Sequence, residues 1–391
     1  MPLGFDWSPV LRVALTGIAV AFGPLSWVWL RHRHQAPAKR LRALTLLTLF
    51  LTFDLVLFGA FTRLTDSGLG CPDWPGCYGH ASPLGADASI AQAQQVMPTG
   101  PVTHSKAWIE MLHRYMATGV GVLILTLTVA RWRERRTGDS LPSLWWPVLA
   151  LLAVCGQGTF GALTVTMKLF PAIVTLHLLG GLLLIALLAA QTAQYDRSVN
   201  LRAAVRVSWG LYAALLLTSL LLLAQITLGG WVSTNYAVLA CREFPSCQGS
   251  WWPVMDFQHG FTVWRALGLT GETVGGEAVN LSFAALTAIH YTHRLMAYGV
   301  LVALAAMAWK LYRVEGLKRQ GRALAGLAAL QLLTGLSNVV LDWPLIAALA
   351  HTGGAAALVG VLVWVLSDCQ PATVGILMQA PVPQHTTGVT A

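Results

Sequence analysis

Charged side chains are scarce in this chain of 391 residues: Asp, Glu, Lys and Arg together make up only 10%. Soluble proteins carry about 25% charged residues, so this composition excludes an ordinary water-soluble domain. Apolar residues make up 55%, and the mean hydropathy is +0.62. Backbone groups in lipid must be satisfied within the protein, which for long apolar runs means helices. The sequence therefore predicts an all-α integral membrane protein.

Nine apolar runs are each long enough to cross a bilayer, which requires about 20 residues. Gly and Pro occur inside several of them and are tolerated where neighbouring helices cover the backbone. The runs cover about 10–30, 42–62, 107–130, 143–165, 172–194, 207–231, 281–309, 323–341 and 345–366.

Basic residues outnumber acidic ones, 25 to 16, giving a net charge of +9. Seventeen of the 25 lie beside the apolar runs in four segments, 31–42, 131–136, 197–206 and 310–322. The positive-inside rule assigns these segments to the cytoplasm, where they contact anionic lipid headgroups. The charge therefore sets topology and does not indicate nucleic acid as a partner. Residues 64–106 and 232–280 then lie outside, on the periplasmic face of a bacterial inner membrane.

The two ends of the chain differ from the rest. The run 10–30 is followed by its basic residues and lacks the charge order and cleavage site of a signal peptide. It predicts an extra N-terminal helix with a basic cytoplasmic linker, together residues 1–41. The polar stretch 370–391 is expected to be a disordered cytoplasmic tail.

Four of the six cysteines recur at one spacing in the two outer segments. GAFTRLTDSGLGCPDWPGCYG begins at Gly59, and GGWVSTNYAVLACREFPSCQG begins at Gly229. A shift of 170 positions places the pair Cys71 and Cys77 on Cys241 and Cys247. An oxidising compartment is where disulfides persist, so structural disulfides that hold each loop are expected. Redox-active pairs that exchange with a periplasmic thiol are the alternative.

Four intramembrane histidines repeat as well. HRYMATG at His113 returns as HRLMAYG at His293, and Gln157, Gly161 and His177 return as Gln331, Gly335 and His351. The chain is therefore a duplication of a four-helix unit, with halves at 42–200 and 201–369. Because four spans return the chain to the same side, the two units have the same orientation in the membrane. The pattern predicts two pseudo-symmetric four-helix bundles plus the extra helix.

Ionisable residues inside spans are costly and are candidates for function by default. Each predicted bundle offers two histidines on facing helices, near the outer side. Zinc requires about four protein ligands, whereas haem supplies four nitrogens of its own and takes axial histidines. The pattern therefore favours a haem in each half. Five arginines near the outer side are available for charge-assisted bonds to haem propionates: Arg63, Arg114, Arg242, Arg265 and Arg294. Of these, Arg114 and Arg294, next to histidines, are equally able to extend to lipid headgroups.

One difference separates the two halves. Glu110 precedes His113 by three positions and shares its helix face, whereas His290 stands at the matching place in the second half. A buried carboxylate can carry protons or stabilise positive charge. A simple ion pair of Glu110 with Arg114 is the alternative. The asymmetry predicts a reacting first half and a fixed cofactor site in the second.

These motifs resemble the haem A synthase family over roughly residues 42–366. The resemblance is carried by TRLTDSGLGCPDWPGC, by ExxHR from Glu110 to Arg114, by HR at His293, and by His177 and His351. It implies a membrane oxidoreductase that converts a methyl group of haem o into the formyl group of haem a for cytochrome oxidase. The N-terminal span departs from the eight helices usual in the family.

The resemblance also implies roles for the individual residues. His293 and His351 are expected to hold a resident haem b, and His113 and His177 the substrate haem o, with Glu110 essential to the reaction. Disulfides are implied for Cys71–Cys77 and Cys241–Cys247. Haem O synthase as substrate donor and cytochrome oxidase assembly factors are the implied partners. Neither the electron acceptor nor the oligomeric state follows from sequence, which leaves a homo-oligomer open.

Two other functions fit part of the pattern. A membrane carrier with two b-type haems is disfavoured because all four histidines lie toward one face. A quinone-linked periplasmic disulfide oxidoreductase explains the cysteines but leaves the histidines without a role.

Overall fold

The computed structural model describes residues 8–136, 141–265, 273–274, 277–278 and 280–372. Within these residues nine helices are long and apolar enough to span a membrane, which confirms the nine predicted spans. The protein is thus an all-helical, multi-pass membrane protein. In chain order, the elements are α1 (Ser8–His32), α2 (Pro37–Leu64), α3 (Asp87–Val96), α4 (His104–Arg133), η1 (Glu134–Arg136), α5 (Trp145–Thr166), α6 (Pro171–Asn200), β1 (Val205–Val207), α7 (Trp209–Thr234), η2 (Ala237–Leu239), α8 (Phe257–Gly260), β2 (Thr273–Val274), β3 (Glu277–Ala278), α9 (Phe283–Tyr312), α10 (Lys318–Val340), α11 (Leu345–Asp368) and β4 (Cys369–Pro371).

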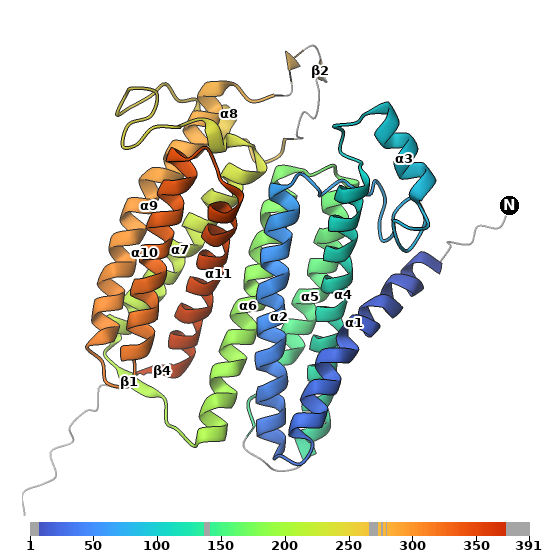
Figure 1. Ribbon diagram of the computed structural model, residues 1–391. Helices are drawn as coiled ribbons and strands as arrows, with labels where there is room; N and C mark the ends of the chain where they lie inside the picture. The colour runs from blue at the N-terminus through green and yellow to red at the C-terminus, as the bar shows by residue number, and fades with distance from the viewer. Residues whose placement is uncertain (1–7, 137–140, 266–272, 275–276, 279, 373–391) are drawn as a thin grey trace, which may run out of the picture.

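The spanning helices after α1 form two sets (Figure 1). In the first set, α2 and α5 each contact both α4 and α6. In the second set, α7 and α10 each contact both α9 and α11. The sets meet where α6 contacts α7 and α11 and where α2 contacts α11. We refer to them below as the first and second helix sets.

The helix α1 lies beside the first set, mainly against α4. The two backbones approach at glycines, because a Cβ on Gly17 would lie 2.3 Å from Thr118 and one on Gly119 3.0 Å from Val20. Small residues that permit close approach are typical of helix contacts in membranes. The helix predicted before residue 41 is therefore present and packed.

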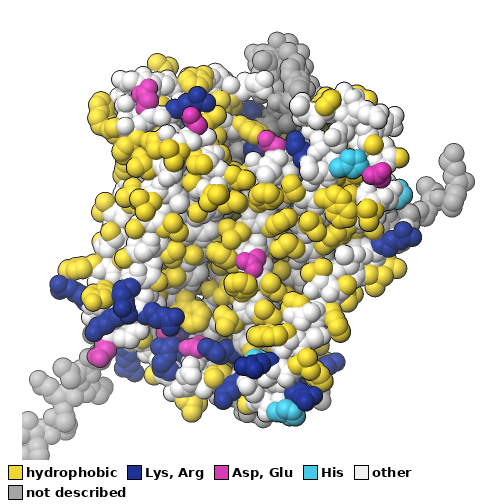
Figure 2. Space-filling view, viewed as in Figure 1, with side chains coloured by type: hydrophobic (Ala, Val, Ile, Leu, Met, Phe, Trp, Pro, Cys, Tyr) yellow, Lys and Arg dark blue, Asp and Glu magenta, His cyan; other side chains and the backbone are white. Residues whose placement is uncertain are grey.

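The two ends of the helices differ in charge and in loop length. Figure 2 shows Lys and Arg side chains gathered at the end where β1 and β4 lie, which we call the basic end. The opposite end, called the loop end, carries the long connections α2–α4 and α7–α9. Short turns join α5 to α6 and α10 to α11 there. This agrees with the positive-inside reading of the sequence.

At the loop end, polar contacts tie the two sets together. Arg63 Nη2 donates to the carbonyl of Ser233 at 2.6 Å, and the Tyr236 hydroxyl donates to Asp66 Oδ1 at 3.0 Å. The Arg63 guanidinium also lies over the Tyr236 ring, 4.1 Å from its centroid. These contacts join segments about 170 residues apart, so they link the beginnings of the two long connections.

At the basic end, the buried carboxylate of Asp368 on α11 links the second helix set to the end of α6 and the segment after it. Asp368 is 0% exposed and accepts from Arg202 Nη2 at 3.0 Å, with Arg197 Nη1 at 3.3 Å. Beside it, β1 pairs in parallel with β4, with Val205 opposite Cys369. The chain after Cys369 was expected to be disordered, but its first residues are held in this strand pair. Residues 373–391 of the predicted tail lie outside the described residues.

We expect Asp368→Asn to destabilise the protein, because the substitution removes the charge that two arginines share. Loss of a buried charged hydrogen-bond partner costs about 1–3 kcal/mol. Thermal denaturation in detergent should show a lowered Tm. Asp342→Asn is the matched control, since Asp342 pairs with Arg242 at a site where both side chains are more than half exposed. Equal Tm values for the two variants would contradict the assignment.

Candidate functional site

Four histidines lie inside the helices near the loop end. His113 is on α4, His177 on α6, His293 on α9 and His351 on α11, each between the seventh and eleventh residue of its helix. At 1.5 Å per residue they lie about 10–16 Å from the helix starts. His113 lies close enough to His177 for a charge on one ring to affect the other, and the same holds for His293 and His351. The structure thus brings the four predicted residues together as two pairs, one in each helix set.

Each histidine ring faces a glycine on the neighbouring helix. A Cβ on Gly59 would lie 3.0 Å from His113 Cε1, and one on Gly161 3.5 Å from His177 Cε1. The second set repeats this closely, with 2.9 Å from Gly229 to His293 and 3.2 Å from Gly335 to His351. A Cβ at Gly59, Gly229 or Gly335 would crowd the ring, whereas one at Gly161 would make an ordinary van der Waals contact.

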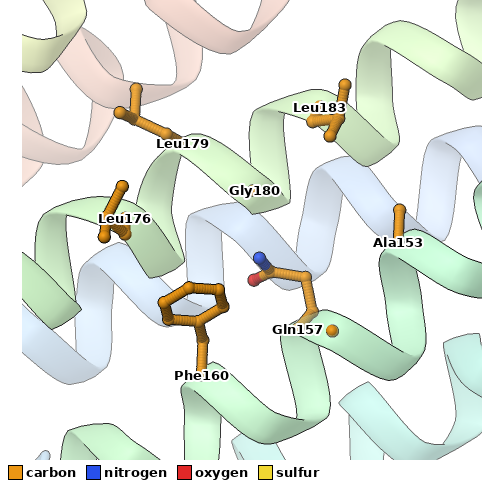
Figure 3. Close-up of a pocket in the computed structure, with 8 residues that line it drawn as sticks. Ala153, Gln157, Phe160, Leu176, Leu179, Gly180 and Leu183 are labelled. Atoms are coloured by element: carbon orange, nitrogen blue, oxygen red, sulfur yellow. The ribbon is translucent and has the colours of Figure 1, made fainter.

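Beside one histidine of each pair, a glutamine side chain is inserted between two helices, and we call it a glutamine wedge. Gln157 extends from α5 to the backbone of α6 at Gly180, where a Cβ would lie 1.7 Å from its amide nitrogen (Figure 3). Gln331 meets Gly354 in the same way and donates to the carbonyl of His351 at 2.9 Å. The repeated Gln and Gly in the sequence are thus explained by close helix packing beside the histidines.

An apolar groove runs along the wedge in the first set. It has a volume of about 360 Å³ and lies between α5 and α6. Figure 3 shows Phe160, Gln157 and Leu176 on its walls, and Leu176 directly precedes His177. The groove therefore reaches the helix turn that carries this histidine.

The ring nitrogens differ between the two sets. Nδ1 of His113 and Nδ1 of His177 are buried without a hydrogen-bond partner among the described residues. In the second set, His293 Nδ1 lies 3.1 Å from Gln225 Nε2, and His351 Nδ1 lies 3.0 Å from Thr334 Oγ1. All four residues are partly exposed.

Glu110 is 4% exposed, and both of its carboxylate oxygens are occupied. Oε1 accepts from Arg114 Nη2 at 2.5 Å, and Oε2 accepts from the backbone N–H of Cys71 at 2.8 Å. The ion pair weighed from the sequence is therefore present, and it is more than a surface contact. Glu110 ties α4 to the first cysteine loop, one turn from His113. At the matching place, His290 Nδ1 lies 3.1 Å from the carbonyl of Ala237.

The arginines next to the histidines point into the cysteine loops. Arg114 Nη1 donates to the carbonyls of Asp73, Pro75 and Gly76 at 2.5–3.2 Å. Arg294 donates in the same manner to the carbonyls of Cys241, Glu243 and Ser246 at 2.8–3.1 Å. Propionate binding and contact with headgroups were the expectations for these two side chains, but they are engaged in holding the loops.

Each loop is closed by a second repeated contact. Asp73 accepts from the N–H of Gly79 at 2.7 Å, and Glu243 accepts from that of Gly249 at 2.9 Å. Sequence reasoning missed this pair, although the shift of 170 places Asp73 on Glu243 and marks them as equivalent acids. The two loops thus share this acid-to-backbone hydrogen bond as well as their disulfide-bonded cysteines.

The loop cysteines are bonded in pairs, Cys71 to Cys77 and Cys241 to Cys247. All four are at most 1% exposed. Thiol exchange requires a thiolate to reach a disulfide sulfur. Burial therefore favours structural disulfides over redox-active ones.

The second loop is also fixed to the helices below it. Trp231 Nε1 donates to the carbonyl of Gly260 at 2.9 Å, and Arg265 donates to Asn235 Oδ1. Asp256 begins α8, and its pKa lies below the usual range because the backbone N–H and the ring of His259 donate to it. These contacts hold α8 over the loop end of α7 and α9.

Among the described residues, no three His, Cys, Asp or Glu side chains converge as ligands of a metal ion. Each histidine pair instead offers two imidazoles from two helices of one set. A haem requires only axial ligands from the protein and a flat apolar space. Two imidazoles in each helix set, each beside a glycine, are a donor set of the kind that such a group requires.

Comparison with known proteins identifies the family. The model of a family described as cytochrome oxidase assembly protein matches residues 42–363. The chain belongs to this family. It is 39% identical to a protein named Heme A synthase from Shewanella oneidensis over 81% of this chain and 93% of that protein. Proteins of the same name from Allorhizobium ampelinum and Rhizorhabdus wittichii are 30% and 26% identical, over 84% and 85% of this chain and 90% and 95% of theirs.

The family match begins at residue 42, within the second turn of α2, so α1 lies outside it. All four histidines, both disulfides and Glu110 lie inside it. The resemblance stated from the motifs is confirmed by this match and by the relatives.

We expect the two disulfides to resist a mild thiol reductant in the folded protein, because their sulfurs are buried. Alkylation followed by mass spectrometry should leave all four loop cysteines unmodified before unfolding. After unfolding in sodium dodecyl sulfate, the same reductant should make all four reactive. Rapid alkylation of the folded protein would instead favour the redox-active alternative.

Proposed function

We propose that this protein is a haem A synthase, an oxidoreductase that converts a methyl group of haem o into the formyl group of haem a. The single observation that carries the proposal is the pairing of four histidines in two helix sets, within a chain whose relatives are named Heme A synthase. The two-haem carrier and the disulfide oxidoreductase gain no support from these relatives.

The architecture belongs to the proposal as well. The first helix set, with residues 42–200, is one four-helix bundle, and the second set, with residues 201–369, is its pseudo-symmetric copy. The repeated glycine contacts, glutamine wedges and arginine-held loops support this division. In the first bundle His113 and His177 bind the substrate haem o. In the second, His293 and His351 hold a resident haem b.

When bound, haem supplies the redox chemistry of its iron, and the protein contributes binding, orientation and electrostatics. The arginine-held loops close the loop end of each bundle and keep bulk water from the histidines. Glu110 fixes the first loop through Cys71 and places a carboxylate one turn from His113. We propose that this carboxylate stabilises positive charge or accepts protons as the methyl group is oxidised.

The cellular setting follows from topology. We propose a bacterial inner membrane location with the basic end in the cytoplasm and the disulfide loops in the periplasm. Disulfides persist in such an oxidising compartment. Haem O synthase would deliver the substrate, and cytochrome oxidase assembly factors would receive the product.

The test is expression with a source of haem o, followed by extraction and chromatography of the bound haems. We expect His293→Ala and His351→Ala to lose the resident haem b, because each removes an axial ligand. His113→Ala and His177→Ala should retain haem b and lose haem a formation. Two equivalents of haem b in the unaltered protein would support the carrier, and no haem at all would support the thiol enzyme.

For Glu110, we expect Glu110→Gln to retain haem b while haem a formation falls by about 100-fold or more, the scale of a lost acid–base or electrostatic group. Glu134→Gln, at the basic end where Glu134 pairs with Arg40, is the matched control and should form haem a normally. Product is measured by chromatography of extracted haem. Normal haem a formation by Glu110→Gln would refute the proposed role.

A further inference from the structure

The second histidine pair is held by side chains that do not belong to the ligand set. Thr334 Oγ1 lies 3.0 Å from His351 Nδ1 and also donates to the carbonyl of Leu330 at 2.7 Å. Because its hydrogen is already engaged, the hydroxyl oxygen is free to accept the ring N–H. This contact sets the tautomer of His351 and leaves Nε2 as the ligand atom.

Gln225 plays the corresponding part at His293. Its amide nitrogen lies 3.1 Å from His293 Nδ1 and 3.1 Å from the His293 carbonyl, and its amide oxygen has no partner. Because this nitrogen donates to the His293 carbonyl, it is the nitrogen that lies toward the ring, 3.1 Å from Nδ1 and 3.5 Å from Nε2. Gln225 therefore holds the ring of His293 in place without accepting its N–H.

The first pair has neither support. The shift of 170 places Leu55 on Gln225, and the shift of 174 places Phe160 on Thr334. Neither side chain can bond to an imidazole, and Nδ1 of His113 and His177 accordingly has no partner among the described residues. Figure 3 shows Phe160 on the wall of the groove beside Gln157. The two histidine pairs lie on equivalent helices and differ in the side chains that contact the imidazole rings.

A metal-bound histidine ordinarily donates its other ring N–H to a fixed acceptor, which orients the ring and raises its basicity. We infer that Gln225 and Thr334 are positioning residues that make the second pair a permanent haem site, and that Leu55 and Phe160 leave the first pair able to bind and release haem. This inference rests on the proposed function. It explains how one duplicated frame holds a cofactor at one site and exchanges substrate and product at the other.

The experiment uses the full chain with Thr334→Val, which keeps the shape of the side chain, and with Gln225→Leu, the residue of the first pair. We expect retention of haem b to weaken by about 10- to 100-fold, the usual effect of removing such a partner. In Thr334→Val the midpoint potential of haem b should rise, because the His351 imidazole loses its acceptor, becomes less basic and stabilises ferric iron less. A tenfold loss confined to the ferric state converts to about 59 mV for one electron.

Two controls separate positioning from packing. Thr334→Ser keeps the hydroxyl and should restore both the haem content and the potential. Thr218→Val removes a buried threonine of the same helix set that donates to Ala214 and is not bonded to either ring, and it should change neither quantity. An unchanged potential and retention in Thr334→Val, in protein that binds haem b, would overturn the inference while leaving the proposed function intact.

The converse substitution tests the first pair. Leu55→Gln combined with Phe160→Thr should cause the first site to keep its haem through purification, raising the haem content per chain. An unchanged haem content per chain would overturn the inference. If the Thr334→Val protein does not accumulate, this measurement alone tests the inference. Absence of haem from the unaltered protein would overturn the proposed function and this inference together.

Discussion

The close approach of three histidine rings to glycines on the next helix, at Gly59, Gly229 and Gly335, is the contact on which the rest of the structure depends. A side chain at Gly59 or Gly229 would meet the ring at about 3 Å, so the helices can pack closely around an imidazole only where the neighbour lacks a side chain. Gln157 and Gln331 then fix the partner helix at Gly180 and Gly354. Because lipid gives no hydrophobic drive for helices to associate, such close contacts carry much of the packing energy.

The loops extend the same frame beyond the helices. Arg114 and Arg294 each follow a histidine, and each donates to three loop carbonyls, so the residue beside the ring fixes the cover above it. A guanidinium presents five donors in a rigid fork, which suits several carbonyls at once better than a lysine would. The buried disulfides limit the loops further. The position of each histidine helix is therefore coupled to the conformation of the cysteine loop above it.

Much of this was predictable from sequence because it depends on local pattern. Hydropathy gave the nine spans, and the internal repeat identified His113, His177, His293 and His351 as pairs. The direction of Arg114 was not predictable, since its acceptors are carbonyls 38–41 residues away in a loop without regular structure. The contact between Gln225 and His293 spans 68 residues and depends on helix rotation, which hydropathy does not fix.

The two helix sets share these repeated contacts and differ in several side chains around the histidines. Beside the first pair the side chains that differ include Glu110, Leu55, Phe160 and Phe58, whose ring stacks on that of His113 with centroids 6.2 Å apart. The matching residues of the second half are His290, Gln225, Thr334 and Leu228. These exchanges concern what surrounds a histidine, and none alters a glycine contact, a wedge or a disulfide. A ring with a fixed acceptor is oriented before its ligand arrives, whereas a ring without one gains its orientation only on binding. Tight holding and release are therefore separable by changes of single side chains within one fold.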